Sequence, residues 1–336
     1  MPPRGSSVSE STQKRRSALV SSPGSATLRL GHLRRSIAVI LLLSGFALPS
    51  AVSRLRNAPP AIARVRVVNE FPHDPHAFTQ GLVYAGNDTL YESTGLYNLV
   101  TCPFLPTFSM LRIPDDINMH CSSVRRVALL TGKVELLHPM AASYFGEGLT
   151  LLHDKLYQVT WLTKTGFIYD KKNLSEVKQF IHSMQDGWGL ATDGNILFGS
   201  DGSSTLYLMD PKTFKVISKH IETYNGHEVY NLNELEFVNG EVWANIWTSD
   251  CFARISYTDG KVVGWILLQN LSENLISSGQ AGVDVLNGIA WDDVDRRIFV
   301  TGKLWPKLYE IELHPAEKKS ERSIERLCMR EPLHLL

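Results

Sequence analysis

Several signals that mark other protein classes are missing from this sequence of 336 residues. Basic and acidic side chains number 34 each, so the formal net charge is zero, and we expect no nucleic-acid partner attracted by a net basic charge. Four cysteines are too few for a fold held together mainly by disulfides. Apolar runs of about 18 or more residues do not recur, which excludes a polytopic membrane protein. Neither His-x-x-x-His nor Cys-x-x-Cys occurs, so the sequence offers no metal-ligand motif.

The N-terminal part differs in composition from the rest. Residues 1–35 are rich in Ser, Arg and Gly without a hydrophobic period, and we interpret them as a disordered basic segment. Residues 36–53 hold a short apolar run between arginines and small residues, which is typical of a signal peptide or a single signal-anchor. We therefore predict entry into the secretory pathway, with a soluble product after cleavage or one membrane anchor. An Arg- and Ser-rich leader with few acids leaves a transit peptide as the alternative. Three N-glycosylation sequons, at Asn87, Asn173 and Asn270, weakly support secretion.

The remainder of the chain is a repeat. From about residue 63, short β-branched and aromatic runs alternate with Gly, Asn and Asp turns, and helical periodicity is scarce. Five segments share a small or polar entry, a Gly-Leu pair or a variant of it, a short turn and a second apolar run. Each predicts a β-hairpin. The five hairpins begin near residues 79, 146, 187, 232 and 286.

A second pair of strand-like runs follows the hairpins, as in 124–129 with 134–137, so each repeat holds about four strands. Two of the four repeat spacings, 41 and 45 residues, match a four-stranded propeller blade. The fifth repeat has three strands, and residues 63–68 can supply its fourth. The predicted fold is all-β: a five-bladed β-propeller over 62–315, closed by an N-terminal strand in the last blade. A β-sandwich with accidental similarity is the alternative. Residues 316–336 are expected to form a surface tail or a short helix.

Equivalent repeat positions predict a functional site. In a propeller, the start of the innermost strand and the end of the next strand lie at one mouth of the channel. Different residue types occupy these positions, whereas a purely structural need would tend to repeat one residue type. Apolar walls with a few convergent polar groups describe a small-molecule or peptide-end pocket. The inner-strand positions are Gln80, Glu147, Trp188, Asn233 and Asn287, and the second-strand positions are Gly95, Trp161, Asp201, Trp247 and Lys303.

Several motifs resemble a known family. Residues 69–82 (NEFPHDPHAFTQGL) are similar to the opening motif of the plant-type glutaminyl-peptide cyclotransferases. Residues 91–97 (YESTGLY), 145–149 (FGEGL), 186–190 (DGWGL), 230–235 (YNLNEL) and 286–290 (LNGIA) also resemble that family. The resemblance covers about residues 65–315. It implies a five-bladed propeller that converts N-terminal glutamine to pyroglutamate with loss of ammonia.

The resemblance carries over particular residues, and the chemistry of the reaction suggests a role for each as a hypothesis. Glu147 would transfer the proton, Asn233 and Gln80 would bind the γ-amide, and Lys303 would stabilise developing negative charge. The apolar walls would come from Phe78, Phe145, Trp161, Trp188 and Trp247. Peptides and proteins with N-terminal glutamine would be the substrates of an expected monomer. The scheme requires no cofactor and no metal, although a structural cation could occupy the channel.

One segment departs from the family pattern. Residues 98–121 separate two motifs that lie within about two residues of each other in the family, and they lengthen the first repeat spacing to 67. The segment is apolar and broken by proline, so its composition resembles a retained intron more than a selected loop. It follows the second strand and would emerge at the mouth. A non-catalytic peptide-binding propeller is therefore one alternative function. A lactonase-like hydrolase is another, but such enzymes use a channel metal held by several carboxylates, and only Glu147 and Asp201 stand at ring positions.

Overall fold

The computed structural model describes residues 61–96, 122–316 and 321–332. The chain divides into two compact units, Met1–Ala58 and Pro59–Leu336, and all described residues lie in the second. The predictions for 1–35, 36–53 and 98–121 therefore fall outside the described residues. No helix within the described ranges is long and apolar enough to cross a membrane.

All five predicted hairpins are present as antiparallel strand pairs. Their apolar residues are buried along most of each strand, as expected for strands covered on both faces. Tight turns containing Gly or Asn at positive φ join the two strands of several hairpins. The pairs are β2 (Thr79–Tyr84) with β3 (Thr89–Thr94), β6 (Gly146–Leu152) with β7 (Lys155–Thr160), β10 (Leu190–Thr192) with β11 (Leu197–Gly199), β16 (Leu232–Val238) with β17 (Glu241–Ile246), and β20 (Leu286–Asp292) with β21 (Arg297–Gly302).

The predicted second strand pairs are also confirmed. They follow four of the hairpins, and along several of their outermost strands fully exposed residues alternate with less exposed ones. The pairs are β4 (Ser123–Ala128) with β5 (Lys133–Pro139), β8 (Thr165–Asp170) with β9 (Glu176–Ile181), β12 (Thr205–Met209) with β13 (Val216–Ile221), and β18 (Cys251–Ser256) with β19 (Lys261–Leu267).

The strand from the start of the described chain joins the end of the repeat. Strand β1 (Ile62–Pro72) pairs antiparallel with β22 (Lys307–Pro315), as the missing fourth strand of the last repeat requires. It also pairs in parallel with β19, which the sequence does not predict. Among the described residues, hydrogen bonding therefore gives three four-stranded sheets and one ten-stranded sheet that includes the short strands β14 (Thr223–Tyr224) and β15 (His227–Glu228).

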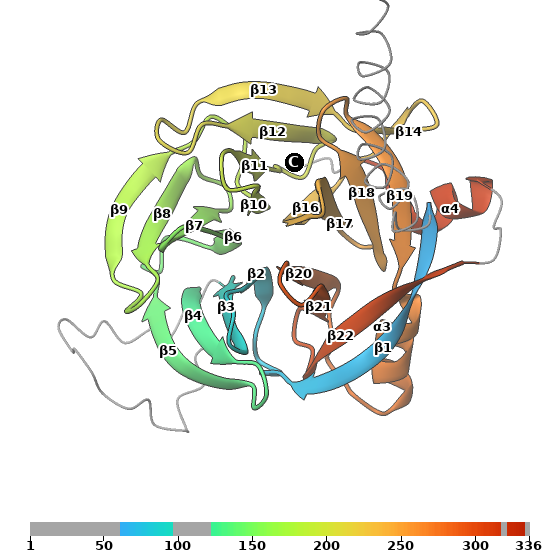
Figure 1. Ribbon diagram of the computed structural model, residues 1–336, viewed down its shortest axis with the longest axis horizontal. Helices are drawn as coiled ribbons and strands as arrows, with labels where there is room; N and C mark the ends of the chain where they lie inside the picture. The colour runs from blue at the N-terminus through green and yellow to red at the C-terminus, as the bar shows by residue number, and fades with distance from the viewer. Residues whose placement is uncertain (1–60, 97–121, 317–320, 333–336) are drawn as a thin grey trace, which may run out of the picture. The chain divides into compact units, whose positions relative to one another are not determined.

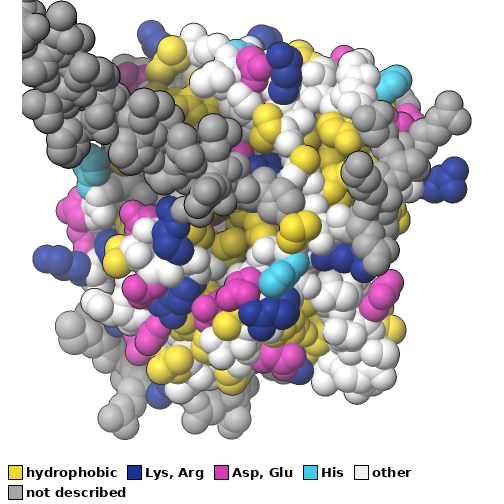
Figure 2. Space-filling model, turned by 45° about the vertical axis from the view of Figure 1, so that its right-hand side comes forward, with side chains coloured by type: hydrophobic (Ala, Val, Ile, Leu, Met, Phe, Trp, Pro, Cys, Tyr) yellow, Lys and Arg dark blue, Asp and Glu magenta, His cyan; other side chains and the backbone are white. Residues whose placement is uncertain are grey.

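The sheets follow one another around a common centre (Figure 1). Strands β2, β6, β10, β16 and β20 lie nearest that centre, and each contacts the next in a closed order. The apolar cores lie between neighbouring sheets. On the face shown in Figure 2, Lys and Arg side chains lie among Asp and Glu side chains.

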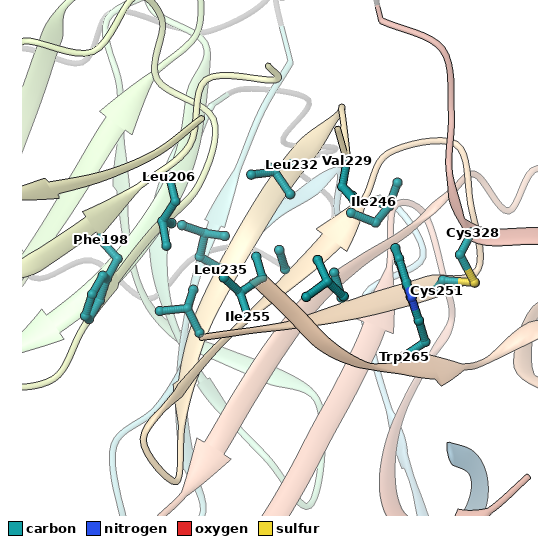
Figure 3. Packing of buried hydrophobic residues seen from close by; sticks show 14 of the residues in the cluster. Phe198, Leu206, Val229, Leu232, Leu235, Ile246, Cys251, Ile255, Trp265 and Cys328 are labelled. Atoms are coloured by element: carbon teal, nitrogen blue, oxygen red, sulfur yellow. A yellow bond between two sulfur atoms is a disulfide. The ribbon is translucent and has the colours of Figure 1, made fainter. Parts of the chain in front are cut away.

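The described residues also form two helices. Helix α3 (Gln269–Ser277) follows β19 and buries Leu271 and Leu275, although the sequence analysis predicts no helix there. Helix α4 (Glu321–Cys328) lies in the expected C-terminal tail, and its Ile324 and Cys328 are fully buried in the core beside β18. A disulfide joins Cys328 to Cys251 (Figure 3).

Candidate active site

Irregular pairing at the start of the inner strands orients the candidate polar residues. In β2, β6, β16 and β20 the register shifts at residues 79–81, 146–149, 232–235 and 286–289. Gln80, Glu147, Asn233 and Asn287 lie within these shifts. Bulges of this kind re-aim side chains and often occur beside active sites. All four side chains are almost fully buried.

The second-strand residues occupy equivalent positions, as the spacing predicts. The backbone N–H groups of Gly95, Trp161, Trp247 and Lys303 each donate to a carbonyl two residues before an inner-strand site residue. In addition, the residue that follows the second-strand position has positive φ in four repeats. These are Leu162 (57°), Gly202 (78°), Thr248 (66°) and Leu304 (60°). Non-glycine residues rarely adopt this conformation, and such strain concentrates at functional sites.

A hydrogen-bonded row of amides holds the central carboxyl group. The Gln80 Nε2 donates to Glu147 Oε1 over 2.9 Å, and Asn287 Nδ2 donates to Gln80 Oε1 over 3.0 Å. Both ends of the Gln80 amide are therefore engaged within the protein. This geometry favours a positioning role for Gln80 rather than direct contact with a substrate amide. Asn287, which the sequence places on the ring without a role, fixes the orientation of Gln80.

Burial dominates the electrostatics of Glu147 and Lys303. Burial raises the pKa of Glu147 well above its ordinary value, Lys303 opposes this change and Asp186 adds to it. Burial also lowers the pKa of Lys303, while Glu147 and Asp284 counteract it. No ion pair joins Lys303 to Glu147 in the described structure. Instead the Lys303 Nζ lies 4.8 Å from the centroid of the Phe78 ring, a cation–π arrangement. A carboxyl group whose pKa is raised can accept a proton in its ionised form and readily donate it in its protonated form.

Aromatic rings line both sides of this centre. Phe145 makes edge contacts with Phe78 and Trp161, with centroid distances of 6.2 and 5.4 Å. A second pair, Trp188 and Trp247, meets edge to face at 5.8 Å.

Two glycines make room for these rings. A Cβ at Gly95 would lie 2.1 Å from a ring carbon of Phe145, and one at Gly202 would lie 2.7 Å from the ring of Trp188. Gly202 also has a φ of 78°, so both its space and its conformation require glycine.

Asp186 is a residue that the sequence analysis does not single out. Its Oδ2 accepts from Trp188 Nε1 over 3.0 Å, and its Oδ1 accepts from the backbone N–H of Leu162 over 2.6 Å. It thereby ties the Trp188 ring to the turn that follows Trp161. Its only sequence signal is its place in the 186–190 motif. Burial raises the pKa of Asp186.

Asn233 lies on the ring but makes different contacts. Its backbone carbonyl accepts from Ser200 Oγ over 2.6 Å, whereas its buried Oδ1 has no partner in the described structure. A buried amide oxygen without a partner is costly unless something else donates to it. It is therefore available to an N–H group of a ligand.

A buried ionic network lies behind the site. Glu92 accepts from Thr79 Oγ1, the neighbour of Gln80, and pairs with Arg125 and His73. His73 in turn contacts the carbonyl of Trp305 over 2.7 Å, two residues from Lys303. The network connects the chain segments that carry Gln80 and Lys303.

The described residues contain no cluster of three or more His, Cys, Asp or Glu side chains that could hold a metal ion.

Comparison with known proteins identifies the family. The glutamine cyclotransferase family model matches residues 37–102 and 118–313, leaving 103–117 within the atypical segment unmatched. The chain is 61% identical over 268 residues to the glutaminyl-peptide cyclotransferase of Arabidopsis thaliana, covering 80% of this chain and 77% of that protein. The structure is also similar to the crystal structure of Myxococcus xanthus glutaminyl cyclase. That match has a TM-score of 0.65 at 30% identity and covers 77% of this chain and all of the other. With the motifs present at the site, the match over most of its length shows that this chain belongs to the glutamine cyclotransferase family.

Proposed function

We propose that this protein cyclises the N-terminal glutamine of peptides and proteins to pyroglutamate and releases ammonia. The observation that carries the proposal is the buried carboxyl group of Glu147, held by Gln80 beside Lys303 and enclosed by aromatic rings. The resemblance in sequence and structure to glutaminyl cyclases supports the same reading.

The reaction needs no nucleophile from the protein, because both reacting groups belong to one substrate residue. The neutral α-amine attacks the γ-amide carbon, a C–N bond forms, and the bond to the amide nitrogen breaks to release ammonia. Glu147 accepts the proton from the attacking amine and returns it to the leaving nitrogen. The site must also hold the glutamine in the folded conformer that brings its α-amine to its γ-amide. The aromatic walls can do this by leaving no room for extended conformers.

Two groups remain to stabilise charge and orient the amide. Lys303 lies against Phe78, and no ion pair holds it among the residues that the structure describes, so its ammonium can face the oxyanion that forms on the γ-carbonyl. The Asn233 Oδ1 can accept from a substrate N–H. In this scheme Gln80 positions Glu147, and the chemistry requires no metal or cofactor.

We propose a five-bladed β-propeller as the finer description of the fold. The closed order of contacts among β2, β6, β10, β16 and β20 supports it. Strand β1 would be the fourth strand of the last blade, and its additional pairing with β19 would merge two blades into one hydrogen-bonded sheet.

Passage through the secretory pathway, as a single-chain enzyme, is also part of the proposal. A buried disulfide is typical of proteins that mature in oxidising compartments, and Cys251–Cys328 supports this route. The sequon residues Asn87, Asn173 and Asn270 are exposed, so glycosylation there is sterically open. Cleavage or anchoring of the N-terminal region and a structural cation in the channel remain predictions.

The rival proposal is a peptide-binding protein without activity. The observation that favours it is the segment 103–117, which the family model leaves unmatched although it matches the sequence on both sides. The retained Glu147 and Lys303 favour catalysis.

One experiment decides between them. The protein with and without residues 98–121 is incubated with a Gln-initiated peptide in the presence of a chelator, and ammonia release is followed. Turnover by both forms supports the cyclase. Turnover by the shortened form alone also supports it and shows that residues 98–121 block activity. Absence of turnover by two well-folded forms overturns the enzymatic proposal.

A further inference from the structure

The carboxyl group of Glu234 joins three of the strands nearest the centre, and the proposed reaction scheme does not use it. Glu234 follows Asn233 in β16 and is almost completely buried. Its Oε1 accepts from the backbone N–H of Leu82 in β2 over 3.3 Å. Its Oε2 accepts from the backbone N–H of Ile289 in β20 over 3.0 Å. One side chain therefore bonds two strands besides its own.

These bonds satisfy backbone groups that no strand satisfies. Strands β2, β16 and β20 each end a hydrogen-bonded order, so one edge of each lacks a neighbouring strand (Figure 1). Buried N–H groups on such an edge need an acceptor from elsewhere. Burial raises the pKa of Glu234, but a carboxyl group keeps acceptor capacity on both oxygens in either protonation state. An amide side chain would instead place an NH2 group, which cannot accept, against one of the two N–H groups.

The two bonds lie beside the backbone irregularities that orient the site residues. Leu82 is two residues after Gln80, and Ile289 is two residues after Asn287. A register shift interrupts the regular ladder of hydrogen bonds, so the start of such a strand is held less firmly by its neighbour. Glu234 thus fixes three strands to one another directly beside the part that the ladder holds least. The shifts lie at residues 79–81 in β2, 232–235 in β16 and 286–289 in β20.

The hydrogen bonds of the site depend on the relative placement of these strands. Asn287 Nδ2 donates to Gln80 Oε1 over 3.0 Å, and Gln80 Nε2 donates to Glu147 Oε1 over 2.9 Å. The first of these bonds joins β20 to β2, the same two strands that Glu234 bonds. A displacement of one strand by about 1 Å would lengthen it beyond the usual range and alter the orientation of Gln80 toward Glu147.

We propose that Glu234 is a positioning residue that clamps β2, β16 and β20 together, so that Gln80, Asn287 and Asn233 keep their places around Glu147. The inference rests on the proposed cyclase function, because it assigns a role in proton transfer to a side chain outside the reacting atoms. Glu234 acts through Gln80 and Asn287 and not on the substrate.

The first test is the kinetics of Glu234→Gln, which keeps the size of the side chain and loses one of the two acceptor contacts. We expect kcat for a Gln-initiated peptide to fall about tenfold, as for the loss of one well-placed hydrogen bond, while KM stays within about threefold. KM changes less because the aromatic walls come from segments outside these three strands. Ammonia release by the full chain measures both constants.

Glu236→Gln is the matched control. Its carboxyl group also belongs to β16 and accepts from the backbone N–H of Trp291 over 3.0 Å, but among the described residues it bonds β20 and not β2. This variant should therefore keep kcat close to the parent value.

Glu234→Asp separates the clamp from the charge, and it replaces Glu234→Gln if that variant does not fold. Aspartate can carry the same charge, but it is one methylene shorter and cannot bond both strands. It should lower kcat as glutamine does. Recovery of kcat by aspartate would assign the effect to charge and overturn the clamp.

A double variant shows whether Glu234 acts through Gln80. Gln80→Met removes the amide that bonds Glu147. When Gln80→Met and Glu234→Gln are combined, the loss of kcat should be smaller than the product of the two single losses, because both changes disturb the same contact. A merely structural effect of Glu234→Gln would multiply with the effect of Gln80→Met, and that result overturns the positioning role.

Amide hydrogen exchange tests the clamp without turnover. The N–H groups of Leu82 and Ile289, followed at single-residue resolution, should exchange faster in Glu234→Gln than in Glu236→Gln. Unchanged exchange at both, or a kcat for Glu234→Gln equal to that of Glu236→Gln, overturns the proposal and leaves the cyclase function standing. If the parent shows no turnover, faster exchange in Glu234→Gln still supports the clamp, and the cyclase function fails alone.

Discussion

At the scale of single residues, Glu147 combines burial with a defined hydrogen bond, and both matter for proton transfer. We predict that Glu147→Gln lowers kcat by about 100-fold or more, the usual range for loss of a general acid–base group. The amide keeps the size of the side chain but cannot exchange a proton with the substrate. Steady-state kinetics of ammonia release measure the effect.

Glu236→Gln is the matched control for this substitution. Burial also raises the pKa of Glu236, to about 8. Its carboxyl group, however, accepts from the backbone N–H of Trp291 and lines a cavity whose walls include Phe237 but not Lys303. Its kcat should stay within about twofold of the parent protein. A Glu147→Gln variant that matched this control would remove Glu147 from the proton-transfer role.

Lys303 should determine the alkaline limb of the pH profile. Burial lowers its pKa below the ordinary value of 10.5, so the ammonium is lost at lower pH than for a free lysine. The substrate amine must be neutral to react, so its titration shapes the acid limb of the profile and does not obscure the alkaline limb. We predict that kcat declines with a midpoint below pH 10.5 and that Lys303→Arg moves this decline upward, since guanidinium stays protonated. A midpoint that the arginine variant does not move would contradict the assignment.

The positions of the site residues could be predicted from the sequence, but some of their interactions could not. Repeat spacing places Gln80 and Glu147 at equivalent backbone positions, yet it says nothing about side-chain rotamers. The engagement of both ends of the Gln80 amide therefore emerges only from the structure. Asp186 escaped notice for the same reason, because its role depends on where the indole of Trp188 points.

At the scale of secondary-structure elements, the direction of the pKa shift of a buried carboxyl group depends on its partners. Burial by itself would raise the pKa of Glu92, but Arg125 and His73 hold it well below its ordinary value. Glu222, at the end of β13, is equally buried, and neither of its carboxyl oxygens has a partner in the described structure. Burial, with a further contribution from Asp259, raises the pKa of Glu222 to about 8.

This difference predicts a pH-dependent effect of Glu222→Gln on stability. Between pH 4.5 and about 8 the folded protein keeps a proton that the unfolded chain releases, so stability falls as pH rises. The slope is about 1.4 kcal/mol per pH unit at most. Glutamine cannot titrate, so the variant should gain on the order of 3 kcal/mol relative to the parent between pH 5 and pH 8.

Denaturant unfolding at several pH values measures that gain. Glu273→Gln, an exposed position on α3, is the control and should show a nearly constant difference from the parent. A difference for Glu222→Gln that also stayed constant with pH would show that Glu222 ionises normally in the folded protein.

Element boundaries illustrate what local patterns can and cannot predict. The hairpins could be predicted because alternating apolar residues and turn residues are local signals. Helix α3 was missed because it is short and amphipathic only through Leu271 and Leu275. The parallel pairing of β1 with β19 was missed because it joins residues about 200 positions apart, which no local pattern encodes.

At the scale of the whole described unit, contacts near both ends of this unit hold the ten-stranded sheet together. Strand β1 bridges β19 and β22. Helix α4 packs on β18 through Ile324 and the Cys251–Cys328 disulfide. Four cysteines in a chain of this size did not predict this link, because nothing in their spacing specifies a partner.

The segment that follows helix α4 also reaches toward the site. The carbonyl of Glu331 accepts from Asn231 Nδ2 over 3.0 Å, and Arg330 Nε donates to the Thr248 carbonyl over 3.1 Å. Asn231 lies two residues before Asn233, and Thr248 follows Trp247. The C-terminal segment therefore supports the wall that Trp247 provides.

We predict that Cys251→Ala/Cys328→Ala destabilises the protein and loosens this wall. The disulfide closes a loop spanning 77 residues, and releasing it should cost about 4 kcal/mol of unfolding free energy. The expected fall in Tm is roughly 5–15 °C. KM for a Gln-initiated peptide should rise more than kcat falls, because Trp247 lies on the binding wall and not at the reacting atoms.

Ile324→Ala separates the covalent link from the packing of α4. It removes a fully buried side chain but leaves the disulfide, so it should lower Tm by a similar or smaller amount while KM stays near the parent value. Reductant should then lower the Tm of Ile324→Ala further and change that of the double cysteine variant by less. If the double variant and the parent shared one Tm and one KM, the disulfide would not be needed: the apolar contacts of α4 and the hydrogen bonds of Arg330 and Glu331 would suffice to hold this segment and the wall.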